Sequence, residues 1–390
     1  MSRIFVCDPV CIQSIGHNVR ALIYYQRILA DYADQIVCLA AKYIPEDIAA
    51  KNSILPFFEF YYNEFIPVLS ASDDPVKMSG SHAQRYALAM ADIERLLDTY
   101  ELGPSDVIFF PSIDFYSLAG LEACKDRFRQ ENSPRVLLRF IGVMENSSTA
   151  YKKPLNVALM YVRSLIDAGC KVSVSAETPI YADWLAGQLD TYVRVTPYGE
   201  VRDPIPIHAG KEFHVICPGS ARFDKGFLRL ENIFKLVRIE DPDISIVFST
   251  QILVDQQIAS YQTYLSRLYA CPGVQLLPSA LENEEMDELY KKCDLVLLPY
   301  DPEIYKYRGS AVLMEAATVG RPVIATEDVG FVEQIRYYGL GIACADDASM
   351  AKQIVEYSAI PKDSRWKKSV QARNRFVDDM RGAFRDWIVA

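Results

Sequence analysis

Short apolar runs alternate with longer segments of helical periodicity along almost the whole chain. This alternation is typical of repeated strand and helix units, which build a parallel sheet covered by helices. The predicted strands are residues 4–7, 35–39, 106–110, 136–140 and 171–175, followed by 213–217, 244–249, 274–277, 295–298 and 322–325. The sequence therefore predicts an α/β protein with two parallel sheets.

A proline-rich stretch separates the two series of strands. Residues 196–210 contain Pro197, Pro204 and Pro206, and proline is poorly suited to the interior of a helix or strand. The chain of 390 residues also exceeds the roughly 250 residues at which a single core usually stops growing. We therefore predict a first domain at 1–198, a second at 199–361, and a C-terminal helix at 362–390 that packs on the body of the protein or on the first domain.

Charge and cysteine content argue against several classes of protein. The net charge of −10 gives nucleic-acid phosphates little to bind, so no nucleic-acid partner is expected. The nine cysteines are dispersed, lie mostly in apolar runs and lack the spacing of zinc ligands. The start of the chain shows no secretory signal, and no apolar stretch approaches the ~20 residues that span a bilayer. We expect a cytoplasmic protein.

The C-terminal segment 362–390 is helical in pattern and richer in basic than in acidic residues. It carries an apolar stripe of Trp366, Phe376, Phe384, Trp387 and Ile388. Such a stripe usually packs into a core, and this interpretation is favoured. The alternative is a basic amphipathic helix in peripheral contact with the inner face of a membrane.

Two cations follow the predicted strand 213–217. The strand leads through Gly219 into a turn that carries Arg222 and Lys225 just before a helix. Ligands of parallel sheets bind at the carboxyl ends of strands, where turn amides and helix N-termini favour anions. Cations at a helix start are unfavourable against the helix dipole, so their presence here indicates a function. We predict that both side chains bind a diphosphate.

A second anion-binding element follows the predicted strand 295–298. An irregular loop leads to Arg308, Gly309, Ser310 and Ala311, where a helix opens on the same edge of the sheet. Farther along that helix, Glu315 lies among apolar residues and needs a partner if it is buried. The two hydroxyls of a ribose could both donate to such a carboxylate.

Three patterns together resemble a known enzyme family. They are Arg222-x-x-Lys225-Gly226, the run from Ser310 to Glu315-Ala316, and Gly320-Arg321-Pro322-Val323-Ile324. In combination they resemble the glycosyltransferases of the GT-B fold, and within these the large retaining family four, the glycosyl transferases group 1. The resemblance implies two Rossmann-like domains that face a central cleft, with a C-terminal helix that can cross back to the first domain.

The resemblance also implies an activity. A sugar would pass from a nucleoside-diphosphate sugar, with a UDP-hexose such as UDP-glucose as the best guess, to a hydroxyl of a sugar or lipid-linked sugar acceptor. The anomeric configuration would be retained, in polysaccharide or glycoconjugate biosynthesis. The donor is a substrate, and no cofactor or metal is expected. The nearest Asp-x-Asp pattern, Asp241 and Asp243, enters a strand at the end away from the site.

Site residues carry over position by position. Arg222 and Lys225 would hold the diphosphate, Glu315 would hold the ribose, and the nucleobase would lie against the loop from Pro278 to Leu281. The family has an earlier glutamate near the transferred sugar, eight positions before the one that binds ribose.

The chain departs from the family at that earlier glutamate. Tyr307 occupies its position, so Arg308 or Glu303 could contact the sugar instead. The departure keeps two alternatives open, namely a nucleotide-sugar epimerase or hydrolase of the same fold and a non-catalytic nucleotide-sugar-binding protein.

Three residues of the first domain are candidates for a catalytic role. His17 lies in a Gly-His turn after the first strand, which resembles a turn that faces the cleft in many such enzymes. It could contact the acceptor or the sugar, or simply cap a helix together with Asn18. Arg139 and Glu145 flank the end of a middle strand, where many relatives place a histidine.

Overall fold

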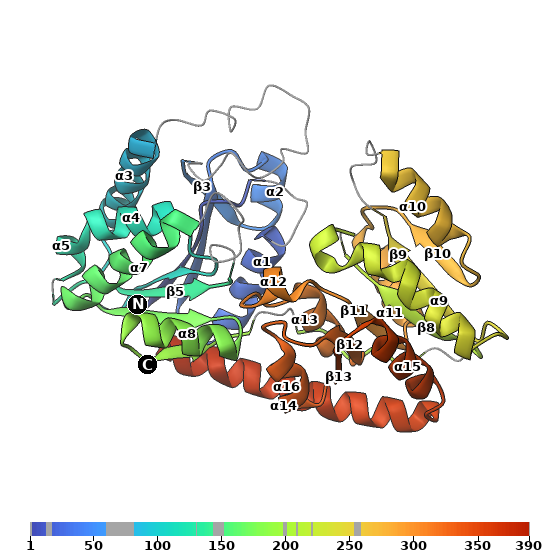
Figure 1. The fold of residues 1–390 in the computed structure, drawn as a ribbon. Coiled ribbons are helices and arrows are strands. Elements are labelled where there is room, and N and C mark those ends of the chain that lie inside the picture. Colours follow the sequence, from blue (N-terminus) through green and yellow to red (C-terminus); the bar gives the residue numbers. More distant parts are fainter. Residues whose placement is uncertain are drawn as a thin grey trace. The chain divides into compact units, whose positions relative to one another are not determined.

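The computed structural model describes residues 2–12, 18–59, 82–129, 131–142, 152–197, 201–207, 210–219, 221–252 and 259–389. These residues form two compact units, each built on its own parallel sheet (Figure 1). Unit 1 comprises Met1–Glu177, Ala182–Thr196 and Ala383–Ala390, and unit 2 comprises Thr178–Tyr181 and Pro197–Gly382. The sequence-based boundary lay at 198/199, and the main division between the units falls between Thr196 and Pro197.

Unit 1 contains a seven-stranded sheet with the order β3-β2-β1-β4-β5-β6-β7. Its strands are β1 (Arg3–Asp8), β2 (Gln35–Ala41), β3 (Ile54–Phe58), β4 (Val107–Phe110), β5 (Arg135–Phe140), β6 (Val172–Ala176) and β7 (Val193–Val195). All neighbouring strands are parallel. The central strand β4 is buried at every position, as expected for a strand covered on both faces.

The helices of unit 1 connect successive strands. They are α1 (Asn18–Leu29), α2 (Glu46–Lys51), α3 (His82–Tyr100), α4 (Phe115–Ala123), α5 (Lys125–Phe128), α7 (Lys152–Asp167) and α8 (Pro179–Leu189), whose first three residues are grouped with unit 2. Helix α4 packs between α3 and α7. A Cβ atom on Gly120 of α4 would lie 2.7 Å from the carbonyl oxygen of Ala89 in α3, so this glycine permits the close approach of the two helices.

Unit 2 contains a six-stranded sheet with the order β10-β9-β8-β11-β12-β13. Its strands are β8 (Phe213–Cys217), β9 (Ile246–Gln251), β10 (Val274–Leu277), β11 (Leu295–Leu298), β12 (Val323–Thr326) and β13 (Gly341–Cys344). All neighbouring pairs are parallel. The carboxyl ends of β8, β9, β10 and β11 therefore share one edge, and the loops that leave this edge carry the predicted donor site.

Helices cover both faces of the second sheet. They are η2 (Phe223–Lys225), η3 (Phe227–Arg229), α9 (Leu230–Glu240), α10 (Ala259–Tyr269), α11 (Asn283–Lys292), α12 (Pro302–Tyr305), α13 (Ala311–Thr318), α14 (Val332–Tyr338) and α15 (Asp347–Ser358). Helix α9 lies between α10 and α15 and buries Phe234, whose ring stacks on Phe248 of β9 at 4.0 Å. The predicted α/β fold with two parallel sheets is confirmed.

The C-terminal helix α16 (Lys362–Val389) contributes residues to both units. In unit 2, Phe376 is buried and packs against Tyr338, with 5.2 Å between the centres of the two rings. In unit 1, Trp387 is fully buried, and its indole Nε1 donates a hydrogen bond of 2.8 Å to Ser173 Oγ. The buried positions of Phe376, Phe384 and Trp387 place the apolar stripe in protein cores.

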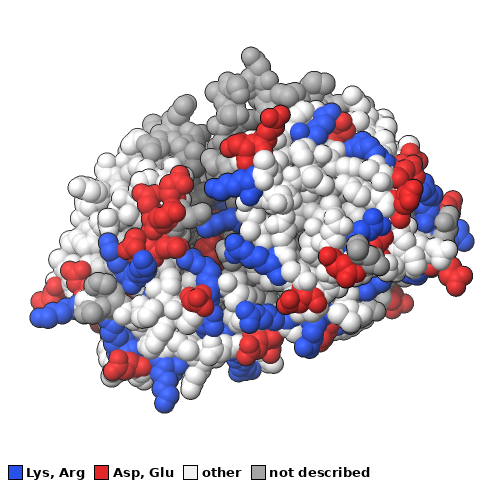
Figure 2. All heavy atoms as spheres, turned by 180° about the vertical axis from the view of Figure 1, so that it is seen from behind, with Lys and Arg blue, Asp and Glu red and all other residues white. Residues whose placement is uncertain are grey.

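Basic and acidic side chains are interspersed over the described part of the face in Figure 2. Within the described residues, every helix is too short or too polar to cross a membrane.

Candidate functional site

The turn after β8 begins at Gly219, which has a left-handed φ of 87° that favours glycine. A Cβ atom at this position would lie 3.2 Å from Val312 Cγ2 and 3.3 Å from Lys225 Nζ. Lys225 and Val312 of the first turn of α13 therefore both lie beside the Gly219 turn. The two anion-binding elements predicted from sequence meet at this point.

Gly226 fixes the segment that carries the two cations. Its φ is 74°, and a Cβ atom there would lie only 1.8 Å from the carbonyl oxygen of Pro299, just after β11. The backbone of Asp224 is held on the same loop, because its carbonyl accepts a 2.9 Å hydrogen bond from Asp301 N. Only glycine fits this contact, which explains the glycine that follows Lys225.

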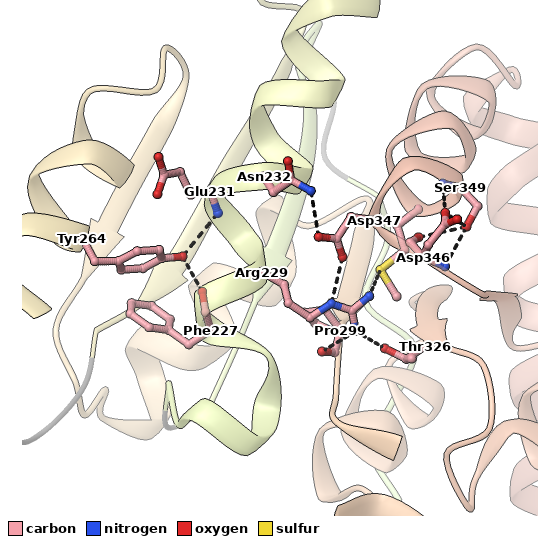
Figure 3. A network of polar contacts seen from close by, with 11 residues as sticks. Phe227, Arg229, Glu231, Asn232, Tyr264, Pro299, Thr326, Asp346, Asp347 and Ser349 are labelled. Carbon is pink, nitrogen blue, oxygen red and sulfur yellow. Dashed lines mark hydrogen bonds and ion pairs between the residues drawn. The ribbon is translucent and has the colours of Figure 1, made fainter. Parts of the chain in front are cut away.

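Arg229 is a further anchor of this segment that the sequence analysis did not identify (Figure 3). Its Nη1 donates to the carbonyl of Pro299 at 3.0 Å and to Thr326 Oγ1 at 2.8 Å, and its Nε pairs with Asp347 Oδ1 at 2.8 Å. One guanidinium thus joins the end of η3 to the ends of β11 and β12 and to the start of α15. Asn232 holds the second oxygen of Asp347 at 2.9 Å.

Arg222 lies at the start of η2 with about half of its side chain exposed, 49%. Its guanidinium pairs with Asp224 at 2.7 Å and donates to the Tyr305 hydroxyl at 2.9 Å. Burial acts to lower the pKa of Arg222, but Tyr305 and Asp224 outweigh it and raise the pKa above its ordinary value. The side chain stays a cation and presents an exposed edge to solvent.

Lys225 is half-buried and differs from Arg222 in its partners. None of the described residues forms a hydrogen bond or an ion pair with its Nζ, which lies 5.9 Å from the centre of the Tyr300 ring. Burial, together with the charge of Arg222, lowers the pKa of Lys225 to about 8, against the opposing effect of Asp224 and Glu315. The ammonium group is therefore desolvated and can gain from an anionic partner.

A small hollow of about 20 Å³ lies beside Lys225, with room for about one water molecule. It is bounded by the carboxyl ends of β8, β9 and β11 through Cys217, Thr250 and Pro299. The hollow thus lies at the edge of the sheet that the sequence analysis assigned to the diphosphate.

Ser310 uses its hydroxyl to cap α13. Its Oγ accepts a 3.1 Å hydrogen bond from Leu313 N, and the side chain is buried. Ala311 follows as the exposed first residue of the helix, while Arg308 and Gly309 are half-buried in the loop before it. The first turn of a helix has backbone N–H groups without partners inside the helix, so this end can still bind an anion.

Glu315 lies one turn farther along α13 and is half-buried. Its Oε2 accepts a hydrogen bond of 3.4 Å from the hydroxyl of Tyr290, which is fully buried. Its negative charge acts on Lys225, so the predicted ribose-binding carboxylate and the predicted diphosphate-binding ammonium belong to one electrostatic cluster.

The loop from Pro278 to Leu281 leaves the carboxyl end of β10, next to β9. Pro278 is exposed, and Ser279 and Leu281 are half-buried. The side chain of Gln251, the last residue of β9, donates to the carbonyl oxygens of Pro278 at 3.4 Å and Ser279 at 3.1 Å. The sequence analysis did not identify Gln251.

Tyr307 is half-buried and packs within unit 2. Its ring lies 5.3 Å from that of Tyr181, and its carbonyl accepts a 2.9 Å hydrogen bond from Thr178 Oγ1. The guanidinium of the neighbouring Arg308 lies 5.8 Å from the centre of the Tyr305 ring. The segment from Tyr305 to Arg308, which connects β11 to α13, is thus held by contacts with aromatic rings.

The three candidates for the acceptor side differ in what the structure says of them. His17 and Glu145 lie outside the described residues. Arg139 is the last but one residue of β5 and is buried. Its guanidinium donates hydrogen bonds to the carbonyls of Thr196 at 2.9 Å and Pro111 at 3.1 Å and forms an ion pair with Glu177 at 2.9 Å. These contacts give Arg139 a structural role in unit 1, and its role in catalysis stays a prediction.

Asp8 is a buried carboxylate of unit 1 that the sequence analysis did not identify. It ends β1 and accepts hydrogen bonds from Val10 N at 3.2 Å and from Asn18 Nδ2 at 3.0 Å. Burial raises the pKa of Asp8 to about 6, with a smaller contribution from the nearby Asp114. No sequence pattern distinguishes Asp8, because its side-chain partner Asn18 lies ten positions farther along the chain.

The described ranges contain no group of three or more His, Cys, Asp or Glu side chains that could hold a metal ion. Metal independence stays a prediction.

Comparisons with known proteins bear on the fold of the whole chain and on the sequence of unit 2. Over 99% of this chain and 96% of the other, the structure resembles a glycosyltransferase from Rickettsia africae ESF-5, with 14% identity and a TM-score of 0.67. A sucrose-phosphate synthase from Thermosynechococcus elongatus is 15% identical over 97% and 94% of the two chains, with a TM-score of 0.59. The Anabaena protein HepE, solved with UDP and glucose, is 14% identical over 96% and 94%, with a TM-score of 0.61. The sequence matches no curated protein.

The fold is that of the glycosyltransferases of the GT-B type. Residues 212–359, which contain every donor-side candidate, match the family described as glycosyl transferases group 1. The predicted fold, the glycosyltransferase class and the resemblance to group 1 are confirmed, whereas the narrower assignment to the retaining family four stays a prediction.

Proposed function

We propose that the protein transfers a hexose from a UDP-hexose, with UDP-glucose as the first choice, to a hydroxyl group of a sugar or lipid-linked sugar. The observation that carries the proposal is Lys225, a desolvated cation without a hydrogen-bonded partner among the described residues, whose Nζ lies beside the Gly219 turn. The choice of UDP is supported by the Anabaena neighbour, which was solved with UDP and glucose.

In the proposed reaction, the bond between the anomeric carbon and the diphosphate oxygen breaks while a bond to the acceptor oxygen forms, and the proton of the acceptor hydroxyl passes to an oxygen of the leaving diphosphate. Negative charge grows on the leaving diphosphate. Arg222, Lys225 and the first N–H groups of α13 would stabilise that charge, and loss of one such donor commonly costs about 3 kcal/mol. These cations would fulfil the role that a metal ion has in other transferases, so the reaction is proposed to need no metal.

The remainder of the donor would contact other residues of unit 2. Glu315 would accept hydrogen bonds from the ribose hydroxyls, and the base would lie against Pro278 to Leu281. Arg308 or Glu303 would contact the transferred hexose, because Tyr307 takes the position of the family's glutamate. From the family resemblance we further propose that the anomeric configuration is retained. The reaction would serve polysaccharide or glycoconjugate biosynthesis, in the cytoplasm or at the inner face of the membrane.

The donor proposal is tested first with a thermal-shift panel of UDP, GDP, ADP and dTDP. A ligand that binds only the folded protein stabilises it by mass action, by about 2.7 kcal/mol at a hundred times its dissociation constant. The largest shift is expected for UDP. If another nucleotide gives a larger shift, that nucleotide takes the place of UDP in the proposal. If none of the four gives a shift, the donor proposal is wrong.

Substitution of Lys225 tests the site itself. Because hydrogen bonds to charged groups contribute about 1.5–3 kcal/mol, Lys225→Ala should weaken UDP binding about tenfold or more in a calorimetric titration. Lys235→Ala is the matched control, since Lys235 of α9 is exposed and pairs with Glu231 at 2.6 Å on the helix surface. Equal UDP affinities of the two variants would exclude Lys225 from the site.

A further inference from the structure

Gln251 lies between two parts of the proposed donor site. It is the last residue of β9, and β9 runs between β8, which leads to the Gly219 turn, and β10, which leads to the loop at Pro278. Its side chain is buried, with 2% of the residue exposed. The sheet topology therefore places one buried amide group between the proposed diphosphate and base segments.

All the hydrogen-bonding groups of this amide are directed at those two segments. Its Oε1 accepts a hydrogen bond from Gly219 N. Its Nε2 donates to the carbonyl oxygens of Ser279 at 3.1 Å and Pro278 at 3.4 Å. The amide has one acceptor for the turn and two donors for the loop, so a side chain with only acceptors or with no polar group cannot replace it.

A buried amide with all its partners in place fixes the segments that it joins, since an unpaired buried polar group is unfavourable. We infer that Gln251 is a positioning residue, which holds the Gly219 turn and the Pro278–Ser279 loop at the separation that one nucleoside diphosphate spans. The inference rests on the proposed function of this edge of the sheet. It assigns Gln251 no contact with the ligand.

The positioning role makes a prediction that differs from a purely structural one. Inorganic pyrophosphate needs only the turn and the two cations, whereas UDP needs the turn and the loop together. Loss of the amide should therefore weaken UDP binding more than pyrophosphate binding. A side chain that only supported the fold would alter both affinities equally or alter neither.

The experiment compares Gln251→Glu and Gln251→Met with the wild type by calorimetric titration of UDP and of pyrophosphate. Glutamate removes both donors at similar shape, and methionine removes all polar groups at similar length. We expect UDP affinity to fall about tenfold and pyrophosphate affinity to fall less than about threefold. Gln275→Glu is the matched control, because Gln275 is an exposed residue of β10 whose Oε1 accepts only a 3.3 Å hydrogen bond from Ser249 among the contacts described.

The outcomes separate the two proposals. If the wild type binds UDP and the Gln251 variants bind UDP and pyrophosphate as well as the wild type does, or lose both equally, the positioning role is overturned and the donor site stands. If the wild type binds none of the four nucleotides, the donor site and the positioning role both fail.

A measurement on the wild type keeps the inference testable if the variants do not fold. Pyrophosphate, added alone, should slow hydrogen exchange in peptides that cover 218–226 and also in those that cover 279–281, because Gln251 connects the two segments. Protection confined to 218–226 would contradict the coupling.

Discussion

At the scale of single residues, the charge of Lys225 is the property that most directly controls the proposed donor site. Its pKa of about 8 lies close to neutral pH, so the free protein loses this charge between about pH 7 and 9. A bound diphosphate favours the charged form and raises the pKa again. Binding above pH 8 should therefore be accompanied by proton uptake, and UDP affinity should fall about tenfold in all between pH 7 and pH 9.

The measurement is a series of calorimetric titrations with UDP at pH 7, 8 and 9 in buffers of different ionisation enthalpy. Lys225→Arg is the control, because an arginine stays charged throughout this range. Its UDP affinity should show no such decline. A decline as steep as that of the wild type would assign the titration to another group.

Asp8 provides a prediction about stability. Its folded-state pKa of about 6 lies above the usual value for an unfolded aspartate, about 3.9. A raised pKa means that protonation favours the folded state, so the contribution of Asp8 is fully present below pH 4 and is lost as the pH rises through 6. Relative to Asp8→Asn, the wild type should lose about 2 kcal/mol of unfolding free energy between pH 4 and 7. Parallel pH profiles in urea denaturation would contradict this shift.

At the scale of structural elements, the contact between η2–η3 and the end of β11 depends on Gly226. In Gly226→Ala the added methyl group would collide with the carbonyl of Pro299, and the left-handed φ would be strained as well. The variant should lose several kcal/mol of stability, of the order of 3, together with UDP binding. Thermal unfolding and the UDP titration check both effects.

The control for this prediction is Gly187→Ala in α8. The added Cβ has nothing within 4 Å, and alanine favours a helix over glycine by about 1 kcal/mol. This variant should be as stable as the wild type or more stable. Similar destabilisation by both substitutions would show that the approach to Pro299 is not the cause.

How much of the structure could be predicted from sequence differs between central and edge elements. The central strands were predicted because they are continuous apolar runs. The missed strands β3, β7 and β13 all lie at sheet edges, where β3 contains Pro56 and β7 has only three residues. Edge strands need fewer backbone donors and less burial, so they tolerate such sequences.

The same distinction holds for the candidate site. The placement of Arg222 and Lys225 at this edge of the sheet was predictable, because both lie in the short turn after a predicted strand, where a cation is unfavourable against the helix dipole. Gln251 and Arg229 were not, because Gln251 contacts Gly219 across 32 positions and Arg229 contacts Asp347 across 118. Only the sheet order, which the sequence does not display, places these residues together.

At the scale of the whole molecule, the donor-side residues and the last residues of the C-terminal helix belong to different units. Every donor-side candidate lies in unit 2, whereas the last residues of α16 belong to unit 1. There Trp387 packs against Phe109 at 5.4 Å, and the carbonyls of Trp387 and Ile388 accept hydrogen bonds from Arg135 at 3.2 and 2.8 Å. The end of the chain is thus part of the core of unit 1.

This division predicts that stability and donor binding can be changed independently. Trp387→Ala removes a fully buried indole and should cost about 3–5 kcal/mol of unfolding free energy. Because Trp387 belongs to unit 1, the dissociation constant for UDP at a temperature where the variant is folded should stay within about twofold of the wild type. Lys225→Ala should show the reverse, with weak UDP binding and near-normal stability. A Trp387→Ala variant that unfolds earlier and also loses UDP affinity while folded would mean that the core of unit 1 helps to shape the donor site, and the two units would then have to be treated as one energetic body.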